Sequence, residues 1–151
     1  MIAQGEPIGP LASPGFWLHR AALDWLADLD LRLTQVGLTH AQFIVLAATS
    51  WVVGDGPGVS QQDIANFSKS DRATTSRVLR ELETRRLVER VSNPASKRSV
   101  IVCMSSHGRE LVKRATALAR ETDREFFAAI ADVKQLRRLL EAVSRAGSES
   151  G

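Results

Sequence analysis

Basic side chains gather in the middle of the chain. Residues 69–98 contain nine Lys or Arg and four Asp or Glu, a net charge of +5, whereas the whole chain carries +3 and the remainder therefore −2. A locally basic segment on a near-neutral body is typical of a protein that binds a polyanion. The alternative is an ordinary solvated helix surface, so the elements that carry these charges must decide. The basic residues are Lys69, Arg72, Arg77, Arg80, Arg85, Arg86, Arg90, Lys97 and Arg98.

A helical wheel over the first half of this segment separates two faces. One face is apolar, and the opposite face carries small, hydroxyl and basic side chains. A helix that reads DNA needs small residues near its N-terminus to enter the major groove, and long donors to reach base edges. We expect Arg77 to contact guanine, Thr74 and Ser76 to meet bases or phosphates, and the remaining cations to hold phosphates. The apolar face comprises Thr75, Val78, Leu79 and Leu82; the phosphate contacts are assigned to Lys69, Arg72 and Arg80. The alternative is that Arg77 and Arg80 pair with Glu81 or Glu83 on an exposed helix.

A short helix is predicted before this helix, and a pair of strands is predicted after it. Ser60 and Asp63 predict the start of a short helix ending near Phe67, and Ser70 or Asp71 starts the next, which runs to about Arg85. Two such helices joined by a short turn make a helix-turn-helix. Residues 87–91 and 99–104 read as strands joined by a basic turn, a wing whose tip carries Lys97 and Arg98. A narrow A·T-rich minor groove has an enhanced negative potential that attracts an inserted Arg, so we expect the tip of the wing to contact the minor groove. The alternative is a mobile basic loop.

Longer amphipathic helices flank this module. Apolar residues recur at helical spacing over 16–37, again after the Thr39–Gln42 capping box, from Ser106 to about Ile130, and over 132–145. We predict a mainly α fold with a small β-hairpin wing, a winged helix-turn-helix flanked by N- and C-terminal dimerisation helices. The outer helices are too apolar for the central module to cover alone, which favours a homodimer; burial within one chain is the alternative.

The predicted organisation has five segments. Residues 1–15, with three of the five prolines, form a flexible arm. The N-terminal dimerisation helix (16–37) precedes the winged helix-turn-helix DNA-binding region (38–105). The C-terminal dimerisation helices (106–146) precede a polar tail (147–151).

The sequence shows no pattern typical of a membrane protein, a secreted protein, an enzyme or a metal-binding protein. The chain has no apolar run long enough to span a bilayer and no secretory leader pattern, and its one cysteine suits a reducing compartment, so we expect the cytoplasm. There is no glycine-rich phosphate loop, Gly-x-Ser-x-Gly elbow or metal-spaced His/Cys set, so we expect neither an enzyme nor a metal or other cofactor. Three alternatives remain open: histidines that converge in space for catalysis, a winged protein-interaction module that does not read DNA, and a thiol redox sensor using Cys103, for which a structural thiol is the simpler reading.

Four short segments between residues 38 and 112 follow a known series of motifs: 38–43 (LTHAQF, against LTxxQF), 82–90 (LETRRLVER, against LExxGLVxR), 96–98 (SKR, against DxR) and 102–108 (VCMSSHG, against VxLTxxG). On these segments, residues 38–112 resemble the MarR family of bacterial regulators. The resemblance implies a triangular homodimer on a pseudo-palindromic double-stranded DNA operator, usually a repressor relieved by a small molecule, with Arg98 in the minor groove and Arg77 in the major groove. Two departures are Ser96 for the wing Asp, which predicts a looser wing, and Arg86 for a glycine, which predicts a different helix end because left-handed backbone is costly for Arg.

The resemblance also implies an effector, often an aromatic acid or lipophilic compound bound between the dimerising helices and the DNA-binding lobe. An Arg or His can pair with a carboxylate, and a Trp can cover a ring. The candidates are Trp17, His19, Arg20, Trp25 and His40. The alternative is that the tryptophans belong to the core or the dimer interface and that His19 and Arg20 are simply solvated.

Overall fold

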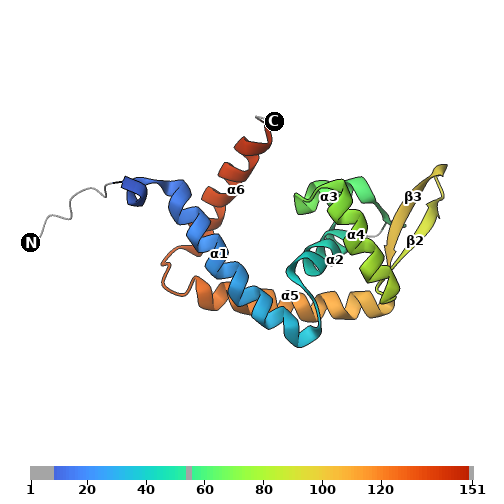
Figure 1. Cartoon of the computed structure of the whole chain (residues 1–151), viewed down its shortest axis with the longest axis horizontal. Coiled ribbons are helices and arrows are strands. Elements are labelled where there is room, and N and C mark those ends of the chain that lie inside the picture. Colours follow the sequence, from blue (N-terminus) through green and yellow to red (C-terminus); the bar gives the residue numbers. More distant parts are fainter. Residues whose placement is uncertain (1–8, 54–55, 150–151) are drawn as a thin grey trace, which may run out of the picture.

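A computed structural model of the chain describes residues 9–53 and 56–149. Its helices are α1 (Pro14–Leu33), α2 (His40–Val53), α3 (Gln61–Ser68), α4 (Arg72–Thr84), α5 (Ser106–Phe126) and α6 (Val133–Glu149). The strands are β1 (Val59–Ser60), β2 (Val88–Asn93) and β3 (Ser96–Met104), and short 3-10 turns occupy Gly9–Ala12 and Thr34–Val36. Figure 1 shows α2, α3, α4 and the β2–β3 hairpin grouped as one lobe, with α5 running along its base. The α1 helix slants from the α6 end down to that base, and α6 stands at the far end from the hairpin. The predicted mainly α fold with a winged helix-turn-helix is confirmed.

Side-chain caps start the helices where the sequence predicts them. Thr39 and Gln42 form the reciprocal capping box of α2, with both backbone N–H groups 3.2 Å from the facing side-chain oxygens. The Ser60 hydroxyl accepts from the Asp63 N–H at 3.1 Å and begins α3. Of the two candidates for α4, Asp71 is the cap, accepting from the Thr74 N–H at 2.8 Å.

The predicted arm is shorter than expected. Residues 1–8 lie outside the described chain, but Gly9–Ala12 form a 3-10 turn and α1 already begins at Pro14. Ser13 caps that helix by accepting from the Phe16 N–H at 3.3 Å. Proline is well suited to the first helical position, because its missing N–H would have no partner there and its φ is already helical.

The wing is a three-stranded sheet in the order β1-β3-β2. Its edge strand β1 was not predicted, because two residues are too few to show an alternating pattern; Val59 pairs with Val102. The hairpin is also tighter than predicted, since Asn93 pairs with Ser96 and only Pro94 and Ala95 lie between the strands. Lys97 and Arg98 therefore belong to β3 rather than to a loop. The Asn93 side chain accepts from the Ala95 N–H at 2.9 Å, which closes the turn locally.

The end of α4 contradicts one expectation. Arg86 adopts the left-handed conformation (φ 57°) in the place of the glycine, so the helix ends in the same way despite the substitution. The Leu87 N–H donates to the Leu82 carbonyl at 3.0 Å and the Arg86 N–H to the Glu83 carbonyl at 2.8 Å, the two bonds of a Schellman cap. Leu82 and Leu87 are both fully buried, so the apolar contact that accompanies this cap outweighs the backbone cost at Arg86.

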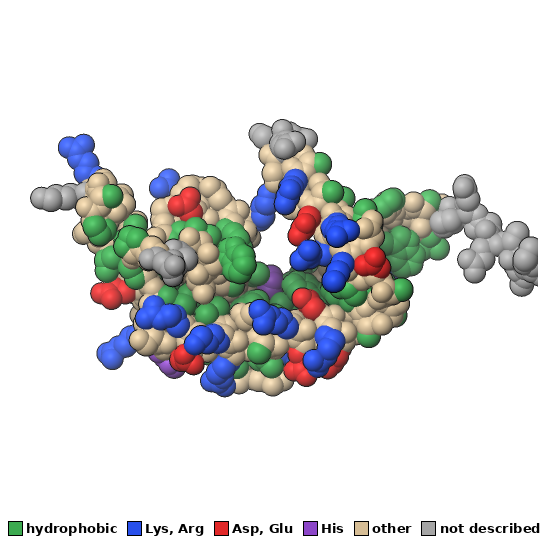
Figure 2. All heavy atoms as spheres, turned by 180° about the vertical axis from the view of Figure 1, so that it is seen from behind, with side chains coloured by type: hydrophobic (Ala, Val, Ile, Leu, Met, Phe, Trp, Pro, Cys, Tyr) green, Lys and Arg blue, Asp and Glu red, His purple; other side chains and the backbone are tan. Residues whose placement is uncertain are grey.

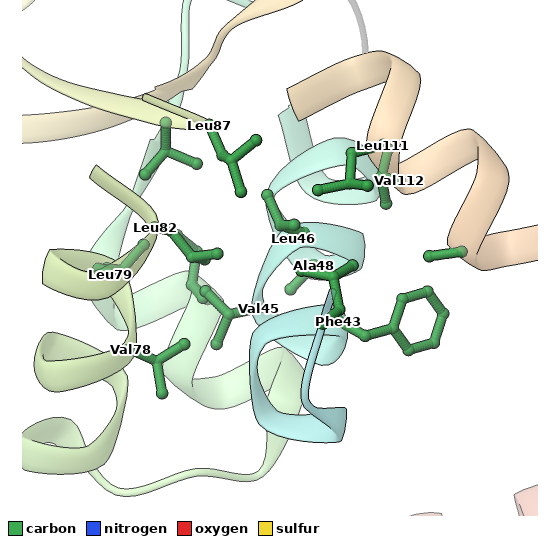
Figure 3. Close-up of a cluster of buried hydrophobic side chains, with 14 of the residues drawn as sticks. Phe43, Val45, Leu46, Ala48, Val78, Leu79, Leu82, Leu87, Leu111 and Val112 are labelled. Carbon is green, nitrogen blue, oxygen red and sulfur yellow. The ribbon is translucent and has the colours of Figure 1, made fainter. Parts of the chain in front are cut away.

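One hydrophobic core joins the winged lobe to α5. Figure 3 shows the buried side chains of α2 lying between those of α4 on one side and those of α5 on the other. Gly108 in the first turn of α5 packs against the start of the wing: a Cβ there would lie 2.1 Å from the Leu87 carbonyl oxygen. The angle between the wing and α5 is therefore fixed by direct backbone contact. The labelled core residues are Phe43, Val45, Leu46, Ala48, Val78, Leu79, Leu82, Leu87, Leu111 and Val112.

The flanking helices differ from the predicted spans at their ends. The α5 helix stops at Phe126, short of Ile130, and α6 continues through Gly147 and Ser148, which were assigned to the tail. Side chains tie α1 to α5: the Trp25 indole donates to Asp123 at 2.8 Å, and Arg32 pairs with Glu121 and Glu125. None of the described helices combines the length and the apolar content that a membrane span needs.

Candidate nucleic-acid interface

The exposed face of α4 is the one the helical wheel predicts. Thr75, Val78, Leu79 and Leu82 are buried against the lobe, while the cations of the same helix point outward. Arg72, Arg77 and Arg80 are all exposed. The helix thus presents three guanidinium groups on the side away from the core, as phosphate and base contacts require.

Thr74, one of the two hydroxyl residues assigned to DNA contact, already has a side-chain partner. The Thr74 hydroxyl donates to Asp71 at 2.6 Å as part of the N-terminal cap. The pKa of the Asp71 carboxyl lies below its usual value because Thr74 donates to it twice. The bond from the Thr74 hydroxyl has the larger effect, and the bond from the Thr74 backbone N–H has the next largest. Thr74 and Ser76 are half-buried, so their approach to DNA is restricted to the outer edge of each side chain.

Arg77 lies in a hydrogen-bonded chain that crosses between two helices. Its Nη1 is 2.6 Å from Glu81 Oε1, and the other oxygen of Glu81 accepts from Gln42 Nε2 of α2 at 3.0 Å. The pKa of the Glu81 carboxyl is lowered, mainly because Gln42 donates a hydrogen bond to it. The hydrogen bond and charge of Arg77 lower it further. The ion pair that the sequence offered as an alternative for Arg77 therefore exists. It leaves 57% of the Arg77 side chain exposed.

Lys69 occupies the turn between α3 and α4. It has left-handed backbone (φ 53°), and the following Ser70 N–H donates to the Ala65 carbonyl at 3.1 Å. Its ammonium donates to the Ser148 hydroxyl near the end of α6 at 2.6 Å. The end of α6 therefore reaches the turn of the helix-turn-helix, although Figure 2 shows open space between the body of α6 and the winged lobe.

The outer part of the wing, at the start of β3, carries Arg98 as its described cation. Arg98 is exposed on β3 and has no ion pair or side-chain hydrogen bond to the described residues. The side chain of Lys97 lies outside what the structure describes. At the position of the family's wing Asp, the Ser96 carbonyl accepts from the Ser99 hydroxyl at 3.2 Å, so the start of β3 is held by a neutral bond.

Arg90 also belongs to this interface, although the sequence shows it only as one more positive charge. Its Nη2 donates to the Ser76 carbonyl at 3.4 Å, and its Nη1 lies 3.8 Å from Glu83. The same Glu83 carboxylate accepts from the Arg90 backbone N–H at 3.3 Å. Arg90 therefore links β2 to the middle of α4 and fixes the wing relative to the recognition helix. The contact spans 14 residues in sequence, so no local pattern could reveal it.

The candidate effector residues do not meet in one place. Trp17 and Trp25 line an apolar groove of about 630 Å³ between α1, the end of α5 and α6. Arg20 stacks over the Phe16 ring at 5.8 Å, and exposed His19 is not among the groove's lining residues. The full lining is Trp17, Leu18, Ala21, Ala22, Trp25, Asp123, Phe126, Phe127, Val133, Leu136, Arg137 and Leu140.

His40 lies at the start of α2, where that helix meets α1. Its ring stands edge-on to Trp25 at 6.3 Å, and its backbone N–H donates to Asp30 at 3.1 Å. Burial lowers the pKa of the imidazole, and the nearby Asp30 carboxylate opposes that shift only in part. His40 therefore favours its neutral form and is a poor partner for a carboxylate near neutral pH.

Cys103 is engaged by the backbone rather than by another reactive group. Its half-buried thiol donates to the Pro57 carbonyl at 2.8 Å, and a Cβ at Gly58 would lie 3.0 Å from the sulfur. Among the described residues, no three His, Cys, Asp or Glu side chains group as metal ligands. The structure thus gives Cys103 a packing role beside the short strand β1.

The comparisons with known proteins agree with this geometry. Residues 36–99 match the MarR family. An uncharacterized HTH-type transcriptional regulator of Bacillus subtilis, YdcH, is 36% identical over 80% of this chain and 82% of its own length. Among solved structures, CouR from Rhodococcus jostii RHA1 bound to p-coumaroyl-CoA has a TM-score of 0.81 at 26% identity, covering 91% of this chain and 95% of its own. The repressor CouR on a 23-mer DNA duplex has a TM-score of 0.75 at 26% identity, covering 97% and 99%.

Proposed function

The chain belongs to the MarR family of winged helix-turn-helix transcriptional regulators, and on that premise we propose that it binds a pseudo-palindromic operator as a homodimer and represses transcription until a small molecule releases it. Its relatives are transcriptional regulators rather than enzymes. Its place of action is then the cytoplasm, where bacterial DNA lies. Residues 38–105 would read DNA, and residues 16–37 and 106–146 would join the two protomers.

One observation carries the DNA-binding proposal: the outward face of α4 bears Arg72, Arg77 and Arg80 beside a hairpin that bears Arg98. Arg77 has the reach for a bidentate contact to guanine O6 and N7 in the major groove. Arg72 and Arg80, with Lys69 in the preceding turn, suit phosphates and would fix position without reading sequence. Arg98 suits the minor groove beside the major-groove site, and we assign Lys97, its neighbour on the wing, as a further DNA contact.

The homodimer proposal rests on apolar surface that one chain leaves uncovered. The groove between α1 and α6 is lined almost wholly by apolar side chains, and Leu139, Leu140 and Val143 of α6 are exposed to solvent. Figure 2 shows hydrophobic side chains at the surface beside α6, and mixed acidic and basic ones along the edge formed by α5. A patch of this kind on a monomer marks an interface, and two copies of the α1–α6 face would bury it symmetrically.

The effector proposal draws on the CouR complex with p-coumaroyl-CoA, a compound with an aromatic acyl group. We expect an aromatic or lipophilic compound here, with Trp17 and Trp25 covering the ring and Arg20 of α1 pairing with a carboxylate. Burial lowers the pKa of His40, so its imidazole would contact an effector as a neutral ring and not as a positive charge. Trp17 and Trp25 are the members of the set that line the groove, whereas His19, Arg20 and His40 are not among its lining residues.

The test is a selection of bound duplexes from genomic fragments, followed by affinity measurements against salt concentration. A recovered palindrome with half-sites about one helical turn apart, and a steep salt slope, is the expected result. The retained sequence then serves as the probe for an effector screen. Binding that is blind to sequence would refute the operator reading and favour a winged module that contacts proteins.

A further inference from the structure

Glu81 stands on the DNA-facing side of α4, where an acidic side chain would repel phosphates. Both of its oxygens are engaged: Oε1 by Arg77 at 2.6 Å and Oε2 by Gln42 at 3.0 Å. An exposed i,i+4 ion pair alone contributes little to stability, because water screens the charges and both side chains lose conformational freedom. The contact from α2 distinguishes this pair from an ordinary one on a helix surface.

Gln42 has only one orientation that satisfies its neighbours. Its Oε1 accepts from the Thr39 N–H at 3.2 Å and from Arg85 Nη1 at 3.1 Å. Two donors on that oxygen leave Nε2 as the atom that must face Glu81. The side chain of Glu81 is therefore positioned by α2 as well as by its own helix, α4.

Arg77 keeps donors to spare in this arrangement. Only its Nη1 is engaged among the described residues, so Nη2 and Nε remain without a protein partner. A bidentate contact to guanine needs two donors in a fork, and an Arg retains such a fork when one terminal nitrogen is held. A long side chain loses conformational freedom when binding immobilises it, and a guanidinium that is already held loses less of it on binding.

We propose that Glu81, oriented by Gln42, is a specificity-determining positioning residue that holds Arg77 ready for guanine. The inference rests on the proposed operator-binding function and adds a residue pair to it. The negative charge of Glu81 lowers the affinity for any duplex. Glu81 nevertheless raises the preference for the operator, because the held Arg77 side chain loses less conformational freedom when it binds the correct base.

The test compares affinities for the selected operator and for a scrambled duplex of equal length, by fluorescence anisotropy at one salt concentration. E81A is expected to bind the scrambled duplex more tightly and to lower the operator-to-scrambled affinity ratio roughly 2- to 10-fold. A repeat selection with E81A should show less guanine at one position of each half-site. The matched control is E89Q, since Glu89 is exposed on β2 without an ion pair or side-chain hydrogen bond in the described chain; it should tighten both duplexes alike.

Gln42 provides a second variant with the opposite change in charge. Q42E keeps the oxygen that caps α2 but places a carboxylate against Glu81, so the affinity ratio should fall as it does for E81A. The exchange Q42E/E81Q restores the net charge and reverses the donor and acceptor of the contact, and it should recover part of the ratio. Melting temperatures close to that of the wild type would confirm that the variants are folded.

The outcomes separate the inference from the function it builds on. An operator-to-scrambled ratio that E81A leaves unchanged, or raises, would overturn the positioning role and make Glu81 a simple repulsive charge. A wild-type protein with no preference among duplexes would overturn the proposed function itself, and the inference with it.

Discussion

Arg86 is the residue whose replacement should make the protein more stable. It holds left-handed backbone (φ 57°) just after the recognition helix, a conformation that costs a residue with a Cβ about 1–2 kcal/mol. The substitution R86G removes that cost. The Schellman bonds persist in the variant because they are made by the backbone, as does the bond that the Ser105 hydroxyl donates to the Arg86 carbonyl at 2.8 Å.

The expected gain is smaller than the cost that is removed. Glycine is freer than arginine in the unfolded chain, which takes back about 0.4–1 kcal/mol. The Arg86 side chain is exposed and has no ion pair or side-chain hydrogen bond with the described residues, so little else is lost. We therefore expect the free energy of unfolding to rise by about 0.5–1 kcal/mol, roughly 2–4 °C in Tm per kcal/mol for a chain of this size.

Urea unfolding followed by circular dichroism measures this change. All proteins must be compared at one concentration, because dissociation of a dimer makes apparent stability depend on it. The control is R86A, which removes the same charge but keeps a Cβ in left-handed backbone and should gain nothing. The reasoning fails if R86G is no more stable than the wild type, or if R86A gains as much.

Four further outcomes are expected. R77A should cost about 1–3 kcal/mol of operator affinity and relax one base position; equal losses on random DNA would contradict base reading. R98A should weaken binding mainly where the flanks are A·T-rich, and insensitivity of both proteins to the flanks would contradict minor-groove insertion. L140E places a charge in the apolar groove and should shift the mass by light scattering from dimer to monomer; a wild-type monomer at micromolar concentration would refute the dimer. The lowered pKa of His40 means that the unfolded chain binds more protons just below pH 6.5, so stability should fall as the pH drops through that range and fall less in H40Q; an unchanged pH slope in H40Q would contradict this.

Local chemistry explains why much of the fold was predictable. The caps at Thr39, Ser60 and Asp71 act over three residues, and the apolar face of α4 repeats every three or four. Signals of that range are complete in the sequence, so the order of the helices and the outward direction of Arg77 followed from it. The helix end at Arg86 was predicted wrongly because the deciding contact, Leu82 against Leu87, depends on the core.

The sequence by itself thus determined the order of the main helices and of the hairpin, which faces are apolar and where the positive charge lies. Only the tertiary structure decided what those charges contact. Gln42 reaches Glu81 across 39 residues, Trp25 reaches Asp123 across 98, and β1 finds β3 although two residues carry no pattern. Such pairs depend on how the helices and strands pack together, and that packing depends on the shapes of buried side chains from the whole chain at once.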